Sequence, residues 1–422
     1  RWFVAATLAV LILAALPPHA EAGPEPPTFL ATAYNTQRKL ARAEDGLLYA
    51  AVTKNVSNTP IVRVLSTDDG ATWATLPPPT TTGLASDRSS LAIDVQGRLH
   101  IVWTELQVAG GQVFYARYAS GAWSAPEQLS HSPSYAGFPS IAVDGQDRAH
   151  VAWYGFDGAF YQIYYRRLDP SGWTSETALT NEAVDATNPA LALDPDAHVH
   201  IAWFRQNRNA TLNEVAYLRL ENDAIVETRT VSPSLVDAIN PSLLVDGSGR
   251  VRIAWTAALG TERIQYAERA PGGTWSAVEF ASPAGTGALH PSLAMDRGGE
   301  VRVVWEGADR QIYTQTRSGA SAWSYPAALT SGGVNRYPSA RWSQFNNPMC
   351  PDSVGIDVVW THEVSGALSL AWTSLSGAGC ATGPTLGALA IAAGIFAVVV
   401  AATVAAVLLL RKRRKGPLPP NA

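Results

Sequence analysis

The sequence predicts an all-β protein: a seven-bladed β-propeller followed by one C-terminal transmembrane helix. Similar stretches return every 50 to 52 residues and end at Trp103, Trp153, Trp203, Trp255 and Trp305. Each repeat holds several short apolar runs separated by turn residues, and four short strands per repeat of ~40–50 residues are typical of a propeller blade. A long apolar segment near the C-terminus predicts the helix.

Composition narrows the class of protein. The chain has 422 residues, of which 47% are hydrophobic, and its formal net charge is −4. An intrinsically disordered chain is excluded, because disorder requires few apolar residues and a high net charge. The two cysteines are too few for a small disulfide scaffold. Nucleic acid is not an expected partner, because neutralising phosphates requires clustered Lys and Arg.

Residues 1–22 have the features of a secretory signal peptide. An apolar run reaches Leu16 and is followed by Ala20-Glu21-Ala22, a small-x-small pattern that predicts cleavage after Ala22. A membrane anchor or a buried strand stays open as an alternative, although the run is shorter than the ~20 residues that span a bilayer.

The C-terminal part predicts a membrane anchor. Residues 386–410 contain no charged residue and are long enough for a spanning helix, and the cluster 411–415 is entirely basic. Since cytoplasmic flanks carry excess Lys and Arg, we expect a single-pass protein of the cell membrane with 411–422 as a cytoplasmic tail. Residues 381–385 form a linker, and the propeller, 23–380, lies outside the cell.

The repeats add up to seven units. Two degenerate copies, residues 38–52 and 338–360, flank the five complete ones, and the last copy is lengthened by an insertion around Cys350. Six blades, a right-handed β-helix and a linear solenoid are the alternative architectures. The β-helix and the solenoid are disfavoured because they use shorter repeats.

Within a unit the strands follow in a fixed order. The first two runs are joined by a tight turn such as 246–249 (Asp-Gly-Ser-Gly), a third run such as 113–118 follows, and a fourth begins near a second tryptophan. The second run is apolar on both faces, as expected for a strand packed between neighbouring blades. The last unit ends after its third run, 368–373. We therefore predict that residues 28–33 supply its fourth strand and remove an open sheet edge.

Both cysteines, Cys350 and Cys380, fall in the last unit. In an exported domain they are expected to form a disulfide that closes a ~30-residue loop, worth about 3–4 kcal/mol. Metal ligation by the pair is the alternative, but no Cys-x-x-Cys or matching His spacing is present. No metal and no cofactor are expected.

One motif carries a family resemblance. Residues 66–73 (Ser-Thr-Asp-Asp-Gly-Ala-Thr-Trp) match the Asp box, Ser-x-Asp-x-Gly-x-x-Trp, through Ser66, Asp68, Gly70 and Trp73. Over residues 28–375 the chain thus resembles the sialidase-like (BNR-repeat) propeller superfamily. The resemblance implies a propeller in which the box is a structural turn between the third and fourth strands.

The resemblance does not carry over the family's catalytic set. The weak candidates are Arg38, near the position of the family's first arginine, together with Tyr337 and Glu306. Residues 47–67, where the family keeps its acid/base Asp, contain no Asp or Glu, and loss of a proton donor costs typically 10²–10⁴-fold in rate. Catalytic members of the family have six blades. We therefore expect a non-catalytic member; a divergent exo-sialidase-like hydrolase is the alternative.

A ligand site is expected at one rim of the central channel. The loop leading into each innermost strand and the loop leaving each second strand end on the same rim, because these strands are antiparallel. The candidate rim residues are Arg38, Arg88, Glu105, Phe138, Tyr154, Asn188, Phe204, Arg205, Asn240, His290, Glu306, Arg336, Tyr337, His362 and Glu363.

Such a rim suits an extracellular glycan or protein ligand. A purely structural component of the cell envelope is a further alternative. Asn55 and Asn209 lie in Asn-x-Ser/Thr sequons and are candidate glycan acceptors.

Overall fold

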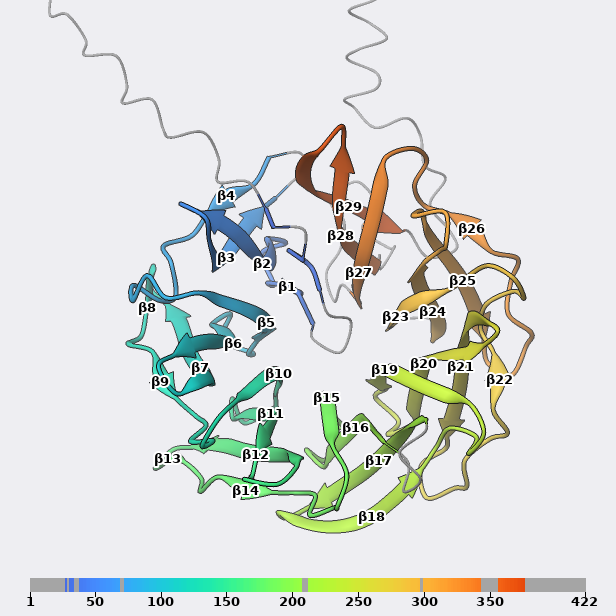
Figure 1. Ribbon diagram of the computed structural model, residues 1–422, viewed down its shortest axis with the longest axis horizontal. Helices are drawn as coiled ribbons and strands as arrows, with labels where there is room; N and C mark the ends of the chain where they lie inside the picture. Colours follow the sequence, from blue (N-terminus) through green and yellow to red (C-terminus); the bar gives the residue numbers. More distant parts are fainter. Residues whose placement is uncertain are drawn as a thin grey trace, which may run out of the picture. The chain divides into compact units, whose positions relative to one another are not determined.

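The computed structural model describes residues 27–28, 30–33, 38–68, 72–206, 212–296, 299–342 and 356–375. These residues form seven antiparallel sheets arranged as blades around a central channel (Figure 1). The predicted seven-bladed β-propeller is confirmed, and the six-bladed alternative is excluded.

The strands of each blade follow one another from the channel outward. Blade 1 contains β1 (Leu40–Arg42), β2 (Leu48–Val56), β3 (Thr59–Thr67) and β4 (Ala74–Thr75); blade 2 contains β5 (Ser86–Ile93), β6 (Leu99–Gln107), β7 (Gly110–Ala119), β8 (Ala122–Trp123) and β9 (Glu127–Gln128); blade 3 contains β10 (Ala136–Val143), β11 (Ala149–Phe156), β12 (Tyr161–Asp169), β13 (Gly172–Trp173) and β14 (Thr177–Ala178). Blade 4 contains β15 (Ala186–Leu193), β16 (Val199–Gln206), β17 (Asn213–Glu221) and β18 (Ala224–Thr230); blade 5 contains β19 (Asp237–Val245), β20 (Val251–Leu259), β21 (Thr261–Arg269) and β22 (Glu279–Phe280); blade 6 contains β23 (Leu289–Met295), β24 (Glu300–Glu306), β25 (Ile312–Ser318) and β26 (Ala327–Ala328); blade 7 contains β27 (Val334–Trp342), β28 (Ile356–Val364) and β29 (Ala367–Leu375).

The turn between the first two strands of a blade forms because an aspartate holds it. In blade 2 the Asp94 carboxylate accepts hydrogen bonds from the backbone amides of Gln96 (3.0 Å) and Arg98 (2.8 Å). Gly97 adopts φ +76°, a left-handed conformation that glycine reaches without strain. The predicted Asp-x-x-Gly hairpins are confirmed.

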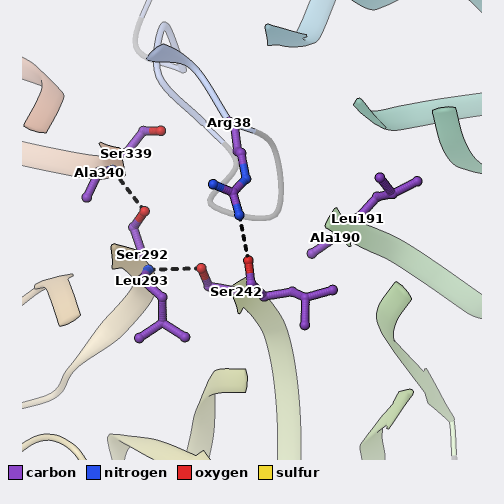
Figure 2. Close-up of a pocket in the computed structure, with 9 residues that line it drawn as sticks. Arg38, Ala190, Leu191, Ser242, Ser292, Leu293, Ser339 and Ala340 are labelled. Carbon is purple, nitrogen blue, oxygen red and sulfur yellow. Dashed lines mark hydrogen bonds between the residues drawn. The ribbon is translucent and has the colours of Figure 1, made fainter. Parts of the chain in front are cut away.

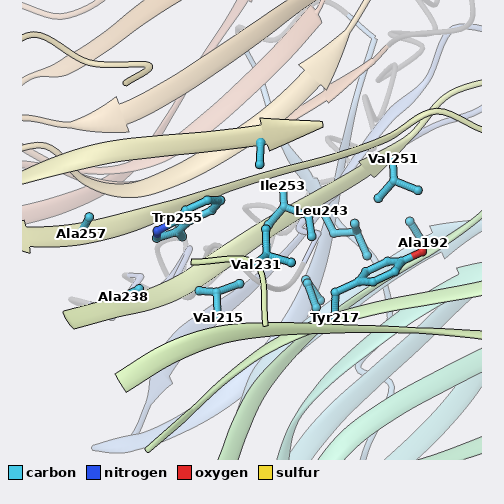
Figure 3. Packing of buried hydrophobic residues seen from close by; sticks show 13 residues of the cluster. Ala192, Val215, Tyr217, Val231, Ala238, Leu243, Val251, Ile253, Trp255 and Ala257 are labelled. Atoms are coloured by element: carbon cyan, nitrogen blue, oxygen red, sulfur yellow. The ribbon is translucent and has the colours of Figure 1, made fainter. Parts of the chain in front are cut away.

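The hydrophobic core lies between the blades. The tryptophans that mark the repeat, in β6, β11, β16, β20 and β24, are completely buried. Figure 3 shows one interface, where Trp255 and Leu243 of blade 5 pack with Val215 and Tyr217 of blade 4. Complete burial of a large apolar side chain contributes about 1.5–3 kcal/mol. The repeat therefore records the packing of each blade against the next.

Three blades also bury a hydrogen-bonded set of aspartate, histidine and tyrosine side chains. These sets lie at the end of the propeller that carries the Asp turns. In blade 2, His100 contacts Tyr115 through Nδ1 (2.9 Å to the hydroxyl) and Asp94 through Nε2 (3.0 Å to Oδ2). The same arrangement recurs around His150 and His200. Burial lowers the pKa of all three histidines, and that of His200 reaches about 4. Their pairing with aspartate satisfies groups that would otherwise be costly to bury.

The prediction that residues 28–33 form the fourth strand of blade 7 is wrong. The Ala31 amide donates to the Thr28 carbonyl (3.0 Å), so the segment turns back on itself instead of extending. It lies along β2, where the Thr28 amide donates to the Thr53 carbonyl (2.9 Å). Thr32 reaches blade 7 through its hydroxyl, 2.8 Å from that of Thr361. The segment bridges blades 1 and 7 near the channel and adds no outer strand.

Polar contacts between blades 1 and 7 close the ring. Arg42 of β1 forms two hydrogen bonds with the buried Asp357 of β28, at 2.7 and 2.8 Å. The Lys39 amide donates to Ser339 Oγ of β27 (3.1 Å). An arginine bound to a carboxylate by two parallel hydrogen bonds is among the stronger ion pairs. These bonds hold together the two blades that the chain itself does not connect.

Several predicted features lie outside the described residues. These are the signal peptide (1–22), the transmembrane helix (386–410), both cysteines, Asn209 and Gly70 of the Asp box. Across the part of the chain that the structure describes, no helix is long and apolar enough to cross a membrane.

Candidate functional site at the channel mouth

The innermost strands share an unusual backbone feature at one end of the channel. Six of them carry a β-bulge whose residue adopts a left-handed conformation, with φ between 50° and 54°: Arg88, Phe138, Asn188, Asn240, His290 and Tyr337. None is a glycine, and such a conformation costs about 1–3 kcal/mol. Since the innermost strands surround the channel (Figure 1), these residues form a ring at its mouth. The structure thus brings together the rim residues that the sequence predicted from the leading loops.

In three blades the residue after the marker tryptophan accepts a hydrogen bond from the bulge of the next blade. Thr104 Oγ1 accepts the Phe138 amide and Thr256 Oγ1 accepts the His290 amide, both at 3.2 Å. In blade 6 this position is Glu306, whose Oε2 accepts the Tyr337 amide at 3.3 Å. In blade 6 a carboxylate therefore replaces the threonine hydroxyl as the acceptor for the bulge amide, and it can accept further hydrogen bonds from other groups.

One side of the mouth, at blades 2 and 3, is aromatic. Tyr135, Phe138, Tyr154 and Tyr161, here called the aromatic cluster, have ring centroids 5.2 to 6.4 Å apart. The Arg88 guanidinium lies over the Phe138 ring, 4.6 Å from its centroid. The three tyrosines are half-buried and keep part of their surface in solvent. The cluster offers flat apolar surface beside hydroxyl groups.

The hydroxyls of Tyr135 and Tyr154 stay protonated at neutral pH. Burial raises the pKa of Tyr135 to about 12 and raises that of Tyr154 further, while the positive charge of Arg88 opposes both shifts. A phenol O–H can both donate and accept a hydrogen bond. The cluster thus presents neutral hydroxyls, which suit a ligand rich in hydroxyl groups.

The opposite side of the mouth, at blades 6 and 7, is charged. His290 Nδ1 lies 3.4 Å and Arg310 Nη1 2.5 Å from the carboxylate of Glu306, and the His290 and Tyr337 rings are 4.7 Å apart. We call Glu306, His290, Tyr337 and Arg310 the charged cluster. Glu306 is only 1% exposed, whereas Arg310 is half-buried.

Glu306 is ionised at neutral pH. Burial acts to raise its pKa, but contacts with His290 and Arg310 and the hydrogen bond from the Tyr337 amide outweigh burial and lower it. The carboxylate can orient His290 or accept a proton, but it is not suited to donate one.

A second carboxyl group at the mouth, Asp87, escaped the sequence analysis. It lies in β5 beside Arg88, with which it forms an ion pair. Burial raises the pKa of Asp87, against the opposing charges of Arg88 and Lys39. The family resemblance places the acid/base residue in the segment before the Asp box, and Asp87 comes one blade later. Its raised pKa is the property that a proton donor requires.

Arg38, predicted to lie at the rim, points into the channel. Its Nη2 donates to the Leu243 carbonyl of blade 5 at 2.8 Å. Leu243 comes three residues after Asn240, so the guanidinium lies deeper than the mouth. Burial lowers the pKa of Arg38. The correction has a simple cause: the arginine side chain is long enough to cross the narrow channel.

Two other predicted rim residues belong to the blades instead of the mouth. Glu105 is 1% exposed and accepts hydrogen bonds from Thr80 Oγ1 (2.8 Å) and Trp103 Nε1 (3.3 Å). Arg205 forms ion pairs with Glu182 and Glu214 within blade 4. These contacts give both side chains partners within the blades, and their ligand role stays a prediction.

The remaining candidates lie near the mouth. Asn188 Nδ2 lies 3.4 Å from Asn240 Oδ1, which links blades 4 and 5, and His362 Nδ1 lies 2.7 Å from Asn335 Oδ1. Phe204, Arg336 and Glu363 are half-buried.

The Asp box has the location that the resemblance implied. Ser66, next to the last residue of β3, pairs with Ala74 of β4, and the exposed Asp68 follows β3. Trp73 packs against the hydrophobic cluster between blades 1 and 7. Asn55 is exposed beside the two-residue turn between β2 and β3, where a glycan could be attached.

One group of side chains could hold a cation, at the end of the channel opposite the mouth. Ligand atoms of Asp194, Asp196 and His198 all lie within 4.8 Å of one another. They border a cavity of about 240 Å³ that Arg148 and Arg167 also line. The two arginines oppose binding of a cation, and Asp194 already bonds His198 at 2.8 Å. No metal was predicted from the sequence, and that expectation stays a prediction.

Comparison with known proteins supports the fold. No family model and no curated protein matches the chain. The BP39L lectin from Burkholderia pseudomallei is 16% identical, with a TM-score of 0.59 over 83% of this chain and 99% of the lectin. A PL25 ulvan lyase, solved bound to -[GlcA(1-4)Rha3S]-, is 10% identical, with a TM-score of 0.57 over 83% of this chain and 94% of the lyase. At such identities these likenesses show the fold alone.

A neuraminidase-like protein of A/little yellow-shouldered bat also matches. It is 8% identical, with a TM-score of 0.46 over 70% of this chain and 95% of that protein. An overlap of this size does not argue for the sialidase-like superfamily, and membership in it stays a prediction.

Proposed function

We propose that this protein is a single-pass protein of the cell surface whose propeller binds an extracellular glycan at the channel mouth. The observation that carries the proposal is the aromatic cluster, with Arg88 at its edge and the polar ring of bulge residues beside it. The signal peptide and the basic-flanked apolar segment support the location.

A saccharide fits this surface on physical grounds. Sugar rings expose C–H groups on a flat face that packs against an aromatic ring, while their hydroxyls need donors and acceptors around the edge. The half-buried Tyr154 and Tyr161 can supply both kinds of contact. A lectin and a polysaccharide lyase among the similar structures support this ligand class. A protein ligand and a purely structural envelope role are the alternatives.

The full chain, purified in detergent, tests the proposal on a glycan array. We expect binding to a restricted set of glycans, and Tyr154→Ala should weaken it about 10-fold or more, as the loss of an aromatic contact worth about 1–3 kcal/mol would. Tyr325→Ala is the matched control, because Tyr325 is 95% exposed and lies in blade 6 after β25. Equal binding by both variants, or no glycan bound by the wild type, would contradict the proposal.

A second function is favoured by Asp87. Asp87, a carboxyl group of raised pKa at one side of the mouth, and the ionised Glu306 at the other side offer a proton donor and a carboxylate base, the two roles that a pair of carboxyl groups plays in glycoside cleavage. Release of an aryl group from aryl sialosides or other aryl glycosides, abolished by Asp87→Asn, would establish a hydrolase. Without such turnover the protein is a binding protein, which is the result we expect for sialosides.

A further inference from the structure

A small cavity lies in the central channel, below the mouth. Its volume is about 10 Å³, which is room for one particle the size of a water molecule. Figure 2 shows the Arg38 guanidinium reaching into it, with serine side chains from β19, β23 and β27 around it. None of the nine residues that line the cavity has a carboxylate side chain. They are Arg38, Ala190, Leu191, Ser242, Leu243, Ser292, Leu293, Ser339 and Ala340.

The cavity is positively charged. Arg38 is enclosed by the blades, and its bond to the Leu243 carbonyl uses one of its five N–H donors on a neutral acceptor. A second buried arginine, Arg341, is close enough to feel its charge. Burial, and then the charge of Arg38, lower the pKa of Arg341 to about 10, while the negative charge of Asp357 acts in the opposite direction. Buried cations are costly unless an opposite charge compensates them.

The serines present hydroxyl protons to the same space. Each serine Oγ accepts a hydrogen bond from a backbone amide of the next blade. The donors are the Leu293 amide to Ser242 (3.0 Å), the Ala340 amide to Ser292 (2.9 Å) and the Lys39 amide to Ser339 (3.1 Å). Each hydroxyl thus accepts from the neighbouring blade and still has its own O–H to donate. The lining side chains combine a guanidinium with three hydroxyl donors, which is a donor set for an anion.

We infer that the cavity binds one small monovalent anion, of the halide class, held by Arg38 and the serine hydroxyls. Its size excludes sulfate, phosphate and the carboxylate of a larger ligand. Its charge excludes a metal cation. A water molecule could fill the volume but would leave the arginine charge uncompensated. The anion would touch blades 1, 5, 6 and 7 at once, and it is independent of any ligand at the mouth.

Such an anion makes stability depend on halide concentration, because a ligand that binds only the folded state stabilises it. The test is thermal unfolding of the full chain in detergent at constant ionic strength, as sodium gluconate is replaced by sodium chloride or bromide. We expect a saturable rise in Tm of roughly 2–4 °C. Arg38→Gln should abolish this rise, whereas Arg229→Gln, which removes an exposed cation from β18, should leave it intact.

A crystal of the wild type grown in bromide provides a readout that does not depend on the variants folding. The expected result is an anomalous bromine peak in the cavity, beside Arg38. If Tm responds equally to gluconate and halides, or if the crystal shows only water there, the proposal is wrong. We expect halide to leave glycan binding unchanged, whether or not the cavity holds an anion. The halide proposal and the glycan proposal can therefore fail separately.

Discussion

The two ends of the propeller channel are built by the same strands in opposite ways. At the turn end, three successive blades repeat one buried set of aspartate, histidine and tyrosine, as around His100 and His150. At the mouth, equivalent positions hold a different residue in almost every blade, from Arg88 to Tyr337. Repetition along a chain marks what each blade needs in order to fold. Variation at positions that keep a costly left-handed backbone marks what the fold does not need, and it points to function.

The largest effect is expected at the turn end. Asp144→Ala removes the side-chain partner of the buried His150 and of Arg148. It also removes the carboxylate that accepts a hydrogen bond from the Arg148 backbone amide in the turn. We expect a loss of about 2–4 kcal/mol in the free energy of unfolding, because buried polar groups lose their bonds. Denaturant unfolding measures it. Glycan binding by the folded fraction should not change. If the folded variant lost glycan binding, the turn end would take part in binding, and the proposed separation of a structural end from a binding end would be wrong.

The turn end should also make stability sensitive to acid. Burial lowers the pKa of His200 to about 4, and Asp194 acts against that shift. Below pH 6.5 His200 is therefore protonated in the unfolded chain but stays neutral in the folded chain. The free energy of unfolding falls as the pH is lowered to about 4. His100 and His150 shift in the same direction.

Denaturant unfolding between pH 7 and pH 4 measures this slope. His200→Gln should reduce the slope, even if it lowers stability at pH 7. A variant of the exposed His131, His131→Gln, is the control and should keep the slope of the wild type. Stability that stays constant over this pH range would contradict the assignment of the buried histidines as neutral.

The sequence predicted the parts of the fold that depend on short-range pattern. The turn at Asp94 and the tryptophan at 103 recur in blades 2 to 6, so the hairpins, the repeat period and the rim followed from them. The left-handed bulges were not predicted, because arginine or phenylalanine carries no signal for that conformation. Five of the six bulge residues precede a proline, as in Phe138-Pro139, but a proline favours extended backbone in the residue before it and so does not predict a positive φ.

Contacts between blades were the main source of error. Arg38 bonds Leu243 across the channel, and residues 28–33 turn back along β2 instead of joining blade 7. Neither pairing can be deduced from local pattern, because each depends on which blades face one another after the ring has closed. Asp87 was missed for a related reason: it becomes part of the mouth only because β5 starts there.

The smallest expected effect on stability is the sharpest test of the comparison. Glu306→Thr places at the mouth of blade 6 the residue that blades 2 and 5 use to accept the next bulge amide, at Thr104 and Thr256. The hydrogen bond to the Tyr337 amide should survive, so we expect the free energy of unfolding to change by less than about 1 kcal/mol.

Binding should respond differently from stability. The variant removes the negative charge that His290 and Arg310 face at the mouth, which leaves that side more positive and its side chains less fixed. We expect a change in glycan affinity of several-fold, measured by isothermal titration against a glycan selected on the array, with Thr104→Ser as a control that keeps a hydroxyl at the equivalent position of blade 2. If Glu306→Thr instead unfolds the protein and Thr104→Ser does not, the charged cluster is part of the scaffold, and the variation at the mouth would no longer mark a site.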